Sequence, residues 1–259
     1  MKRVLLTGAA GIVGTALRPL LAQRYETLIS TDRAPITNPA ENEEVTLGDI
    51  ADLDFIRNLA NGVDGIVHLA GMVGPDYTFD EVLEPNIVGT HNVLTAARFA
   101  NVPNVVYASS HHAVGFLKRG EFINHQTAPR PDSQYGLSKA YGESAGSFFA
   151  DKYGLNVMAI RIGFVGDEVI DERRLHTWIS PRDLAQLVHI GLSTPNLGFE
   201  LVYGVSDITE PFFDNTNAAR LGYQPLDRAV DHLADPAILE AKPDPNSPEG
   251  IYIGGHFAA

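Results

Sequence analysis

Short apolar runs alternate with stretches of helical periodicity along most of the chain. The helical patterns cover Ile12 to Ala22, Asp52 to Ala60 and Thr78 to Ala100, and another carries Tyr135. The apolar runs are RVLLTG, ETLISTD, DGIVHLAG, PNVVYASS and LNVMAIRIG. Runs that stay apolar at consecutive positions are typical of strands buried on both faces. Their alternation with helices predicts an α/β fold with a doubly wound parallel sheet.

The stretches between these elements contain no internal repeat and no low-complexity segment. The polar stretches Pro35–Glu44 and Ala241–Gly250 are rich in Pro, Asp and Glu, which favours surface loops.

Charge and cysteine content exclude several classes of function. The formal net charge is -13, which argues against nucleic acid and anionic membranes as partners because both require a basic face. The chain has no cysteine, so it can form neither disulfides nor thiolate metal sites. No apolar stretch approaches the length of a transmembrane helix, and glycine interrupts the first apolar run too early for a signal peptide. We therefore expect a cytoplasmic protein.

Three glycines, Gly8, Gly11 and Gly14, connect the first apolar run to the first helical pattern in TGAAGIVG. Without a Cβ, this turn and the helix N-terminus can approach a pyrophosphate closely, as in dinucleotide-binding proteins. A glycine-rich turn that binds no dinucleotide is the alternative.

Acidic residues after the next strands bear on the choice of cofactor. Asp32 ends the second apolar run, where a carboxylate can accept hydrogen bonds from a ribose diol and repel a 2′-phosphate. It favours NAD over NADP, although Arg33 could hold that phosphate. Asp49 either bonds an adenine edge or caps the helix that follows.

A tyrosine and a lysine, Tyr135 and Lys139, lie one helical turn apart among small residues in SQYGLSKAYGESAG. Tyrosine, with an ordinary pKa of ~10, is a poor base at neutral pH, and a lysine at i+4 favours the phenolate. Ser109 and Ser110 end the preceding strand, where a hydroxyl can hydrogen-bond a reacting oxygen. An exposed i,i+4 pair without a catalytic role is the alternative.

Together, the glycines, Asp32, HLAG, the serine pair and the YxxxK pattern resemble the extended short-chain dehydrogenases/reductases, the NAD-dependent epimerase/dehydratase superfamily. The resemblance covers essentially the whole chain. It implies a Rossmann fold, NAD as cofactor, no metal, and Ser110, Tyr135 and Lys139 as the catalytic group. The cofactor-binding residues that it implies are Gly8, Gly11, Ile12, Gly14, Asp32, Arg33, Asp49, Ile50, Leu69, Ala70, Gly71, Asn86, Tyr135 and Lys139. Considered separately from the resemblance, Asn86 could be a simple helix residue, and the residue type of His68 favours a core histidine.

Within this branch, SSHHAVG, RIG, RRLHTWISPRDLA, YGVSD and FFDNTNAARLGYQP resemble the uronate dehydrogenases. These enzymes oxidise glucuronate or galacturonate at C1 to an aldarolactone with NAD. The substrate-binding residues that the resemblance implies are Val73, Ser110, His111, His112, Tyr135, Phe164 and Arg173. Arg173 would bind the substrate carboxylate, with Arg174 as the alternative in a shifted register.

Three positions depart from the uronate dehydrogenase pattern. His111 replaces an asparagine that contacts sugar hydroxyls, Phe164 replaces a serine, and Val73 or Gly74 stands where another serine is expected. These changes affect expected contacts to the sugar and leave the hydride chemistry intact.

The resemblance also predicts the organisation of the chain. We expect a single unit over residues 1–259, with residues 1–163 forming most of the NAD-binding core and residues 164–259 a small substrate-binding portion. About a hundred residues follow Arg161, too few for the large second domain of most nucleotide-sugar enzymes, which favours a small sugar acid. The alternatives are a sugar or sugar-phosphate dehydrogenase of the same subgroup, a nucleotide-sugar epimerase or dehydratase, and a non-enzymatic NAD-sensing regulator. Homo-oligomers are common in this family and are a further expectation.

Overall fold

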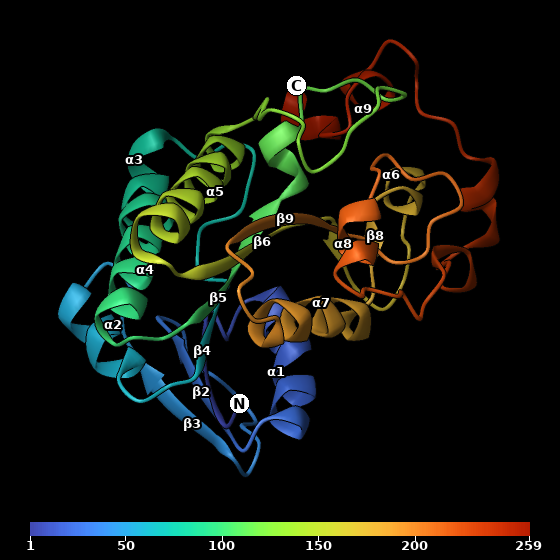
Figure 1. Cartoon of the computed structure of the whole chain (residues 1–259). Coiled ribbons are helices and arrows are strands. Elements are labelled where there is room, and N and C mark those ends of the chain that lie inside the picture. Colours follow the sequence, from blue (N-terminus) through green and yellow to red (C-terminus); the bar gives the residue numbers. More distant parts are fainter.

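A parallel sheet of seven strands forms the centre of the computed structural model, which describes residues 1–259. The strand order is β3-β2-β1-β4-β5-β6-β9, and all neighbours are parallel (Figure 1). The strands are β1 (Arg3–Thr7), β2 (Thr27–Asp32), β3 (Glu43–Leu47), β4 (Gly65–His68), β5 (Asn104–Ser110), β6 (Asn156–Ile162) and β9 (Phe199–Gly204). The predicted doubly wound parallel sheet is confirmed.

Helices cover both faces of this sheet (Figure 1). One face is covered by α1 (Ile12–Arg24) and α7 (Pro181–Ser193). The other face is covered by α2 (Leu53–Ala60), α4 (Gly89–Phe99) and α5 (Gln134–Tyr153). In β1, Val4 and Leu6 join the core under α1 and α7, whereas Leu5 joins the core on the opposite face. Because successive side chains of a strand alternate between faces, a strand covered on both sides needs a continuous apolar run.

The remaining elements are short, and most lie in the C-terminal part of the chain. They are α3 (Phe79–Val82), the π-helix η1 (Leu83–Val88), η2 (His111–Val114), β7 (Phe164–Val165), α6 (Glu172–Leu175), β8 (Trp178–Ile179), α8 (Thr216–Arg220), η3 (Ala229–Asp231), η4 (Pro236–Glu240), α9 (Pro248–Ile251) and η5 (Gly255–Ala258). A third apolar cluster, which includes Val114, Trp178, Tyr203 and Ile253, packs these elements against residues that follow β5 and β9. Apolar contacts therefore connect residues 164–259 to the preceding part of the chain.

The elements differ from the sequence pattern at a few places. The stretch from Thr78 to Ala100 is not one regular helix, because it passes through the π-helix η1, which contains Pro85. Strand β3 begins at Glu43, inside the expected loop, and is exposed along most of its length. Strand β9 contains Glu200, and both strands lie at sheet edges, where the apolar run is shorter or absent. The sequence pattern did not predict β3, β9 or α7.

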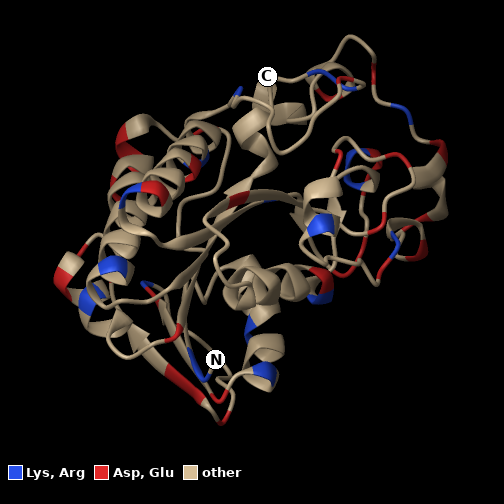
Figure 2. Cartoon of the chain, in the orientation of Figure 1, with Lys and Arg blue, Asp and Glu red and all other residues tan.

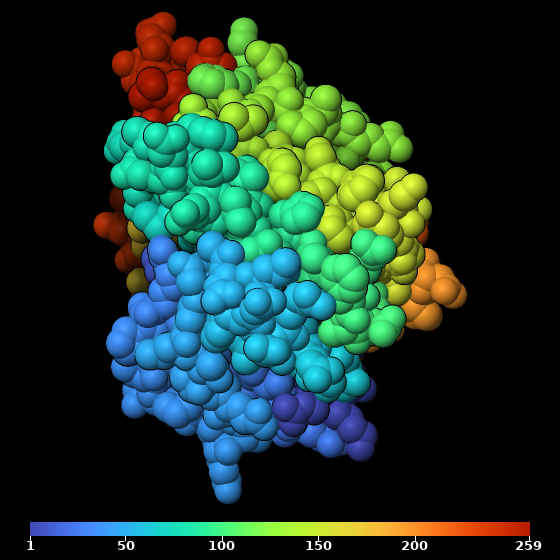
Figure 3. Space-filling view, turned by 90° about the vertical axis from the view of Figure 1, so that its left-hand side faces the viewer, coloured from blue at the N-terminus to red at the C-terminus, as the bar shows by residue number.

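The C-terminal segment returns to the region that follows β5. The Ile253 amide donates to the Leu117 carbonyl at 3.0 Å, and the Gly254 amide donates to the Gly115 carbonyl at 3.0 Å. Figure 3 shows the C-terminal residues in red at the upper edge of the molecule, beside residues coloured green. This return brings the last residues of the chain close to the carboxyl ends of the central strands.

Charged residues are spread over many elements. Figure 2 shows Lys and Arg positions scattered among the helices and loops, with Asp and Glu interspersed. Arg18 and Glu43 form one of the buried ion pairs, with 2.5 Å between Arg18 Nε and Glu43 Oε1, and this pair fastens α1 to the edge strand β3. No helix of the chain combines the length and apolar character needed to cross a membrane.

Candidate active site

A cavity of about 640 Å³ lies along the carboxyl edge of the sheet. It opens beside β1 and β4, where the strand order reverses direction, which is the usual ligand position in open α/β sheets. All predicted site residues except Asn86 line this cavity. They are Gly8, Gly11, Ile12, Gly14, Asp32, Arg33, Asp49, Ile50, Leu69, Ala70, Gly71, Val73, Ser110, His111, His112, Tyr135, Lys139, Phe164 and Arg173.

The three glycines of the first turn have different structural roles. Gly8 has a positive φ of 74°, and a Cβ there would lie 2.5 Å from the Ala70 nitrogen. A Cβ on Gly14 would lie 2.2 Å from the Gly8 oxygen, whereas one on Gly11 would meet nothing closer than 3.4 Å. Helix α1 also begins without a side-chain cap. No protein side chain therefore bonds the first amides of the helix, which lie at the cavity. This arrangement fits a dinucleotide pyrophosphate, which such amides bind.

The Asp32 carboxylate is held at the edge of this turn. Its Oδ2 accepts a hydrogen bond from the Ala10 amide at 2.9 Å, and its Oδ1 accepts one from the Ala34 amide at 3.0 Å. The carboxylate is thus oriented within the cavity wall at the end of β2, where a ribose diol could donate to it.

The residues beside Asp32 form a second pair at the rim. Arg33 Nη1 lies 3.6 Å from Asp49 Oδ2, and both side chains are more than a third exposed. The cap of α2 is Asp52, whose carboxylate accepts from the Asp54 and Phe55 amides. The helix-cap alternative for Asp49 is therefore wrong, and Asp49 remains at the cavity edge.

Both ring nitrogens of His68 have hydrogen-bond partners within the protein. His68 Nδ1 lies 2.8 Å from Thr7 Oγ1 and its Nε2 lies 3.0 Å from Thr90 Oγ1. Burial lowers the pKa of His68 to about 3, so the ring is neutral, and the core-histidine alternative is confirmed.

Asn86 lies behind the cavity wall. Its Oδ1 accepts from the Met72 amide at 2.7 Å, and its Nδ2 donates to the Met72 carbonyl and to Ser138 Oγ at 3.0 and 2.8 Å. These bonds hold the loop after β4 against α5. Because the side-chain amide of Asn86 is already bonded, this geometry does not favour the expected direct contact between Asn86 and a cofactor.

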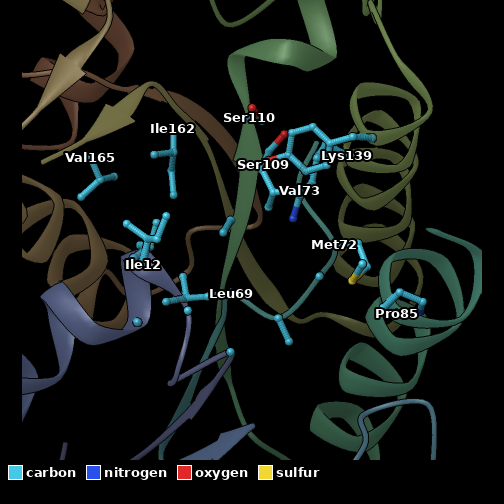
Figure 4. Close-up of a pocket in the computed structure, with 18 of the residues that line it drawn as sticks. Ile12, Leu69, Met72, Val73, Pro85, Ser109, Ser110, Lys139, Ile162 and Val165 are labelled. Carbon is cyan, nitrogen blue, oxygen red and sulfur yellow. The ribbon is translucent and has the colours of Figure 1, made fainter. Parts of the chain in front are cut away.

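Ser110, Tyr135 and Lys139 come together on one side of the cavity, and all three are at least 94% buried. Lys139 Nζ lies 5.7 Å from the centre of the Tyr135 ring and 5.2 Å from that of Tyr107. Figure 4 shows Ser109 and Ser110 at the end of β5, next to Lys139, which reaches from α5. The alternative of an exposed tyrosine–lysine pair is therefore wrong.

The direction of the Tyr135 pKa differs from the sequence-based expectation. Burial raises the pKa of Tyr135 to about 12, although hydrogen bonding by Ser110 favours the ionised form. Burial also lowers the pKa of Lys139 to about 8. Desolvation is thus the main influence on this phenol, and a positive charge close to it, such as that of a nicotinamide ring, would favour its ionisation.

The two neighbouring arginines at the other end of the cavity differ in their partners. Arg174 forms an ion pair with Asp171 and lies 4.2 Å above the centre of the Phe164 ring. Arg173 has no carboxylate within ion-pair distance, and its Nη2 lies 2.6 Å from His111 Nε2. The geometry therefore favours Arg173 over Arg174 as the group that is free to bind an anion.

The structure adds cavity residues that sequence reasoning missed. Phe257 stacks on the His112 ring with 3.8 Å between centres, and His256 lines the same wall. His112 Nδ1 lies 2.7 Å from Asp132 Oδ2. Burial raises the pKa of Asp132 to about 6 and lowers that of His112 well below its usual value. No motif marks the C-terminal pair, and only the return of the chain brings it here.

Val73 and Phe164, at positions where serines are expected, add apolar surface to the cavity. Val73 is 62% exposed on the loop after β4, and Phe164 is half-buried in β7. Figure 4 places Val73 near Lys139, with Ile12 and Leu69 on the other side of β5. Neither replacement supplies a hydroxyl, so polar contacts to a sugar must come from other residues.

Comparison with known proteins agrees with the fold and with the family expected from the sequence motifs. Residues 4–189 match the family described as NAD dependent epimerase/dehydratase. The chain is 43% identical over 259 residues to a uronate dehydrogenase of Pseudomonas putida, covering 99% of this chain and 95% of that protein. It is 33% identical over 249 residues to an NAD-dependent glucose-6-phosphate dehydrogenase of Haloferax volcanii, covering 88% and 94%.

A solved structure extends this likeness to three dimensions. A mutant of uronate dehydrogenase from Agrobacterium tumefaciens, complexed with NAD, has a TM-score of 0.93 and 35% identity, with 100% of this chain and 97% of that chain covered. The resemblance expected from the sequence motifs is confirmed. With a family match over most of its length and relatives that align from end to end, the chain belongs to the NAD dependent epimerase/dehydratase family.

Proposed function

We propose that the protein oxidises a hexuronate, such as glucuronate or galacturonate, at C1 with NAD to give the aldarolactone. The observation that carries this proposal is the guanidinium of Arg173, which has no carboxylate partner and lies in the same cavity as Ser110, Tyr135 and Lys139. A uronate has a hydroxyl at C1 and a carboxylate at the far end of the sugar, and it could engage both sites at once. The uronate dehydrogenase relatives support the same substrate class.

The chain offers separate groups for each part of the cofactor. The amides at the start of α1, beside Gly11, would hold the pyrophosphate, and Asp32 would accept from the adenosine ribose diol. Lys139 would donate to the nicotinamide ribose from α5. NAD, when bound, supplies the hydride acceptor.

The residues around C1 would handle the proton. Ser110 and Tyr135 would hydrogen-bond the C1 hydroxyl, and the Tyr135 phenolate would take its proton as general base. Lys139 would stabilise the phenolate by its charge. A cyclic hemiacetal oxidised in this way yields a lactone without any metal ligand from the chain.

The charge of the cavity favours a carboxylate over a phosphate ester. Arg174 is already paired with Asp171, which leaves Arg173 as the single uncompensated arginine at the sugar end. A planar guanidinium suits a carboxylate of one charge, whereas a phosphate dianion would require further basic groups. This observation ranks a uronate above the sugar-phosphate alternative, and the catalytic group argues against a regulator without activity.

The first test is NADH formation at 340 nm with the purified protein and glucuronate, galacturonate, glucose or glucose 6-phosphate. We expect turnover of the uronates with NAD at least ~10-fold more efficient than turnover of glucose, because hydrogen bonds to a charged group contribute roughly 1.5–3 kcal/mol. Faster turnover of glucose 6-phosphate than of either uronate would contradict the proposal.

Cofactor choice is expected to depend on Asp32. Asp32→Ser removes the carboxylate that repels a 2′-phosphate, and Arg33 can then approach that phosphate. The ratio of kcat/KM with NADP to kcat/KM with NAD should therefore rise about 100-fold. The matched variant Asp32→Ser/Arg33→Ala should lose most of this gain. Initial rates at varied cofactor concentration measure both, and an Asp32→Ser variant that still excludes NADP as the wild type does would show that another group selects NAD.

Three further expectations remain predictions. They are the cytoplasmic location, assembly into a homo-oligomer, and the division of roles between residues 1–163 and residues 164–259.

A further inference from the structure

His111, the residue that replaces the expected asparagine, uses both of its ring nitrogens within the protein. Its Nε2 lies 2.6 Å from Arg173 Nη2, and its Nδ1 lies 3.0 Å from the Ile162 carbonyl oxygen. A guanidinium can only donate hydrogen bonds, so Nε2 must accept and the proton must reside on Nδ1, which donates to Ile162. The ring is 4% exposed, and burial, together with His112 and Arg173, lowers the pKa of His111 well below its usual value. His111 is therefore a neutral imidazole in one defined tautomer.

Arg173 is held at two points by this arrangement. Besides its bond to His111, its Nε donates to the Ile253 carbonyl at 3.0 Å. Gly255 packs directly against the arginine side chain, since a Cβ there would lie 2.8 Å from Arg173 Cδ and Nε. The contacts leave the rest of the guanidinium fork free, and they orient it between η2 and the returning C-terminal segment.

We propose that His111 is a positioning residue for substrate selectivity: it orients Arg173 toward the substrate carboxylate and makes no hydrogen bond to the sugar. The inference deepens the proposed function and rests on it. The uronate dehydrogenase pattern would have an asparagine at this position contact sugar hydroxyls, but His111 has no free nitrogen for such a contact.

His112 provides the contrast. Its Nδ1 is engaged by Asp132, whereas its Nε2 has no protein partner and the ring lines the cavity. A sugar hydroxyl can therefore hydrogen-bond His112 Nε2. Of the two adjacent histidines, His111 would position the anion-binding arginine and His112 would bind a sugar hydroxyl. Loss of His112 would weaken the binding of all sugar substrates, whereas loss of His111 would selectively weaken the binding of sugars that carry a negative charge.

The kinetic test compares His111→Leu, which lacks an acceptor for Arg173, with His111→Gln, whose amide oxygen can reach the position of Nε2. We expect His111→Leu to raise the KM for glucuronate about 10-fold or more while kcat changes less than about 3-fold. The ratio of kcat/KM for glucuronate to that for glucose should fall by a similar factor, and His111→Gln should restore most of it. In an Arg173→Ala background, His111→Leu should have little further effect on glucuronate.

Equal losses for glucuronate and glucose in His111→Leu would mean that His111 contacts the sugar itself and would overturn the proposal. An additive effect of the two substitutions would do the same. Melting temperatures of all variants show whether a loss reflects unfolding.

A second measurement does not depend on activity. Nitrogen NMR of histidine-labelled protein, with the His111 signals assigned from His111→Gln, should show a protonated Nδ1 and a hydrogen-bonded Nε2 whose resonance shifts in Arg173→Ala. A protonated Nε2 in the wild type would overturn the proposal. If the wild type does not oxidise uronates, the proposed function fails, while this spectrum still decides whether His111 holds Arg173.

Discussion

Tyr135→Phe is expected to lower kcat for uronate oxidation on the order of 10³-fold, because it removes only the phenol oxygen, which as a phenolate would accept the substrate proton. Tyr135 is buried, so solvent water has little access to the position from which the phenol oxygen would act as the base. The phenylalanine ring fills almost the same volume, so the cavity and its neighbours His112 and Phe257 should keep their packing. Initial rates at 340 nm under saturating NAD and glucuronate measure the effect.

The matched control is Tyr141→Phe, the same chemical change on the same helix at a half-buried position that does not line the cavity. Its kcat should stay within about 2-fold of the wild type. Binding of NADH, followed by its fluorescence, should be retained in Tyr135→Phe. If that variant binds NADH and keeps more than about a tenth of the wild-type kcat, Tyr135 is not the general base.

Glu143→Gln is expected to lower the free energy of unfolding by about 3–5 kcal/mol, since it leaves the charge of Arg161 buried without its partner. Arg161 Nε and Nη2 each lie 2.8 Å from a Glu143 oxygen, and the two side chains are 1% and 6% exposed. Ser109 Oγ donates to the same carboxylate at 2.6 Å, and Tyr203 Oη accepts from Arg161 at 2.8 Å. Denaturant unfolding monitored by circular dichroism measures the change.

Two variants separate this buried pair from an ordinary one. Glu26→Gln removes one partner of an exposed ion pair with Lys2 and should cost less than about 1 kcal/mol. Glu143→Met/Arg161→Met removes both buried charges and should recover much of the loss, because neither charge is then left uncompensated. Equal losses for Glu143→Gln and Glu26→Gln would contradict the expected role of the buried pair.

The same pair connects stability to the catalytic geometry. Glu143 lies on α5, two helical turns after Tyr135, and Arg161 lies on β6 beside the strand that ends in Ser110. The ion pair therefore fastens the helix that carries Tyr135 and Lys139 to the strands beneath it. Variants that weaken it should lose activity at lower temperature than the wild type does.

Features with a local physical cause could be predicted from the sequence. The continuous apolar runs of β1, β4, β5 and β6 predicted strands covered on both faces, because strand periodicity and burial are expressed within a few residues. The glycine turn, Asp32 and the pair Tyr135 and Lys139 were also predicted, since each depends on short spacings along one turn or helix. The edge strands β3 and β9 were missed because partial exposure permits charged residues there.

Only the tertiary structure decided features that depend on segments distant in sequence. Arg173 and Arg174 are adjacent in the chain, and their difference arises from His111 and Asp171. Phe257 reaches the cavity because the C-terminal segment returns beside η2, a path that no short motif encodes. Likewise, the spacing of Tyr135 and Lys139 suggested a lowered tyrosine pKa, whereas burial raises it.

The physical reason is common to these cases. Spacing along the chain determines which residues can share a turn, a helix face or a strand edge, and those relations are local. Partners, tautomers and desolvation depend on what the rest of the folded chain packs against each group, and these relations exist only once the fold has formed. Sequence alone therefore determined the fold class of this protein and pointed to its candidate reacting groups, and tertiary structure decided which charged groups lack a charged partner in the cavity.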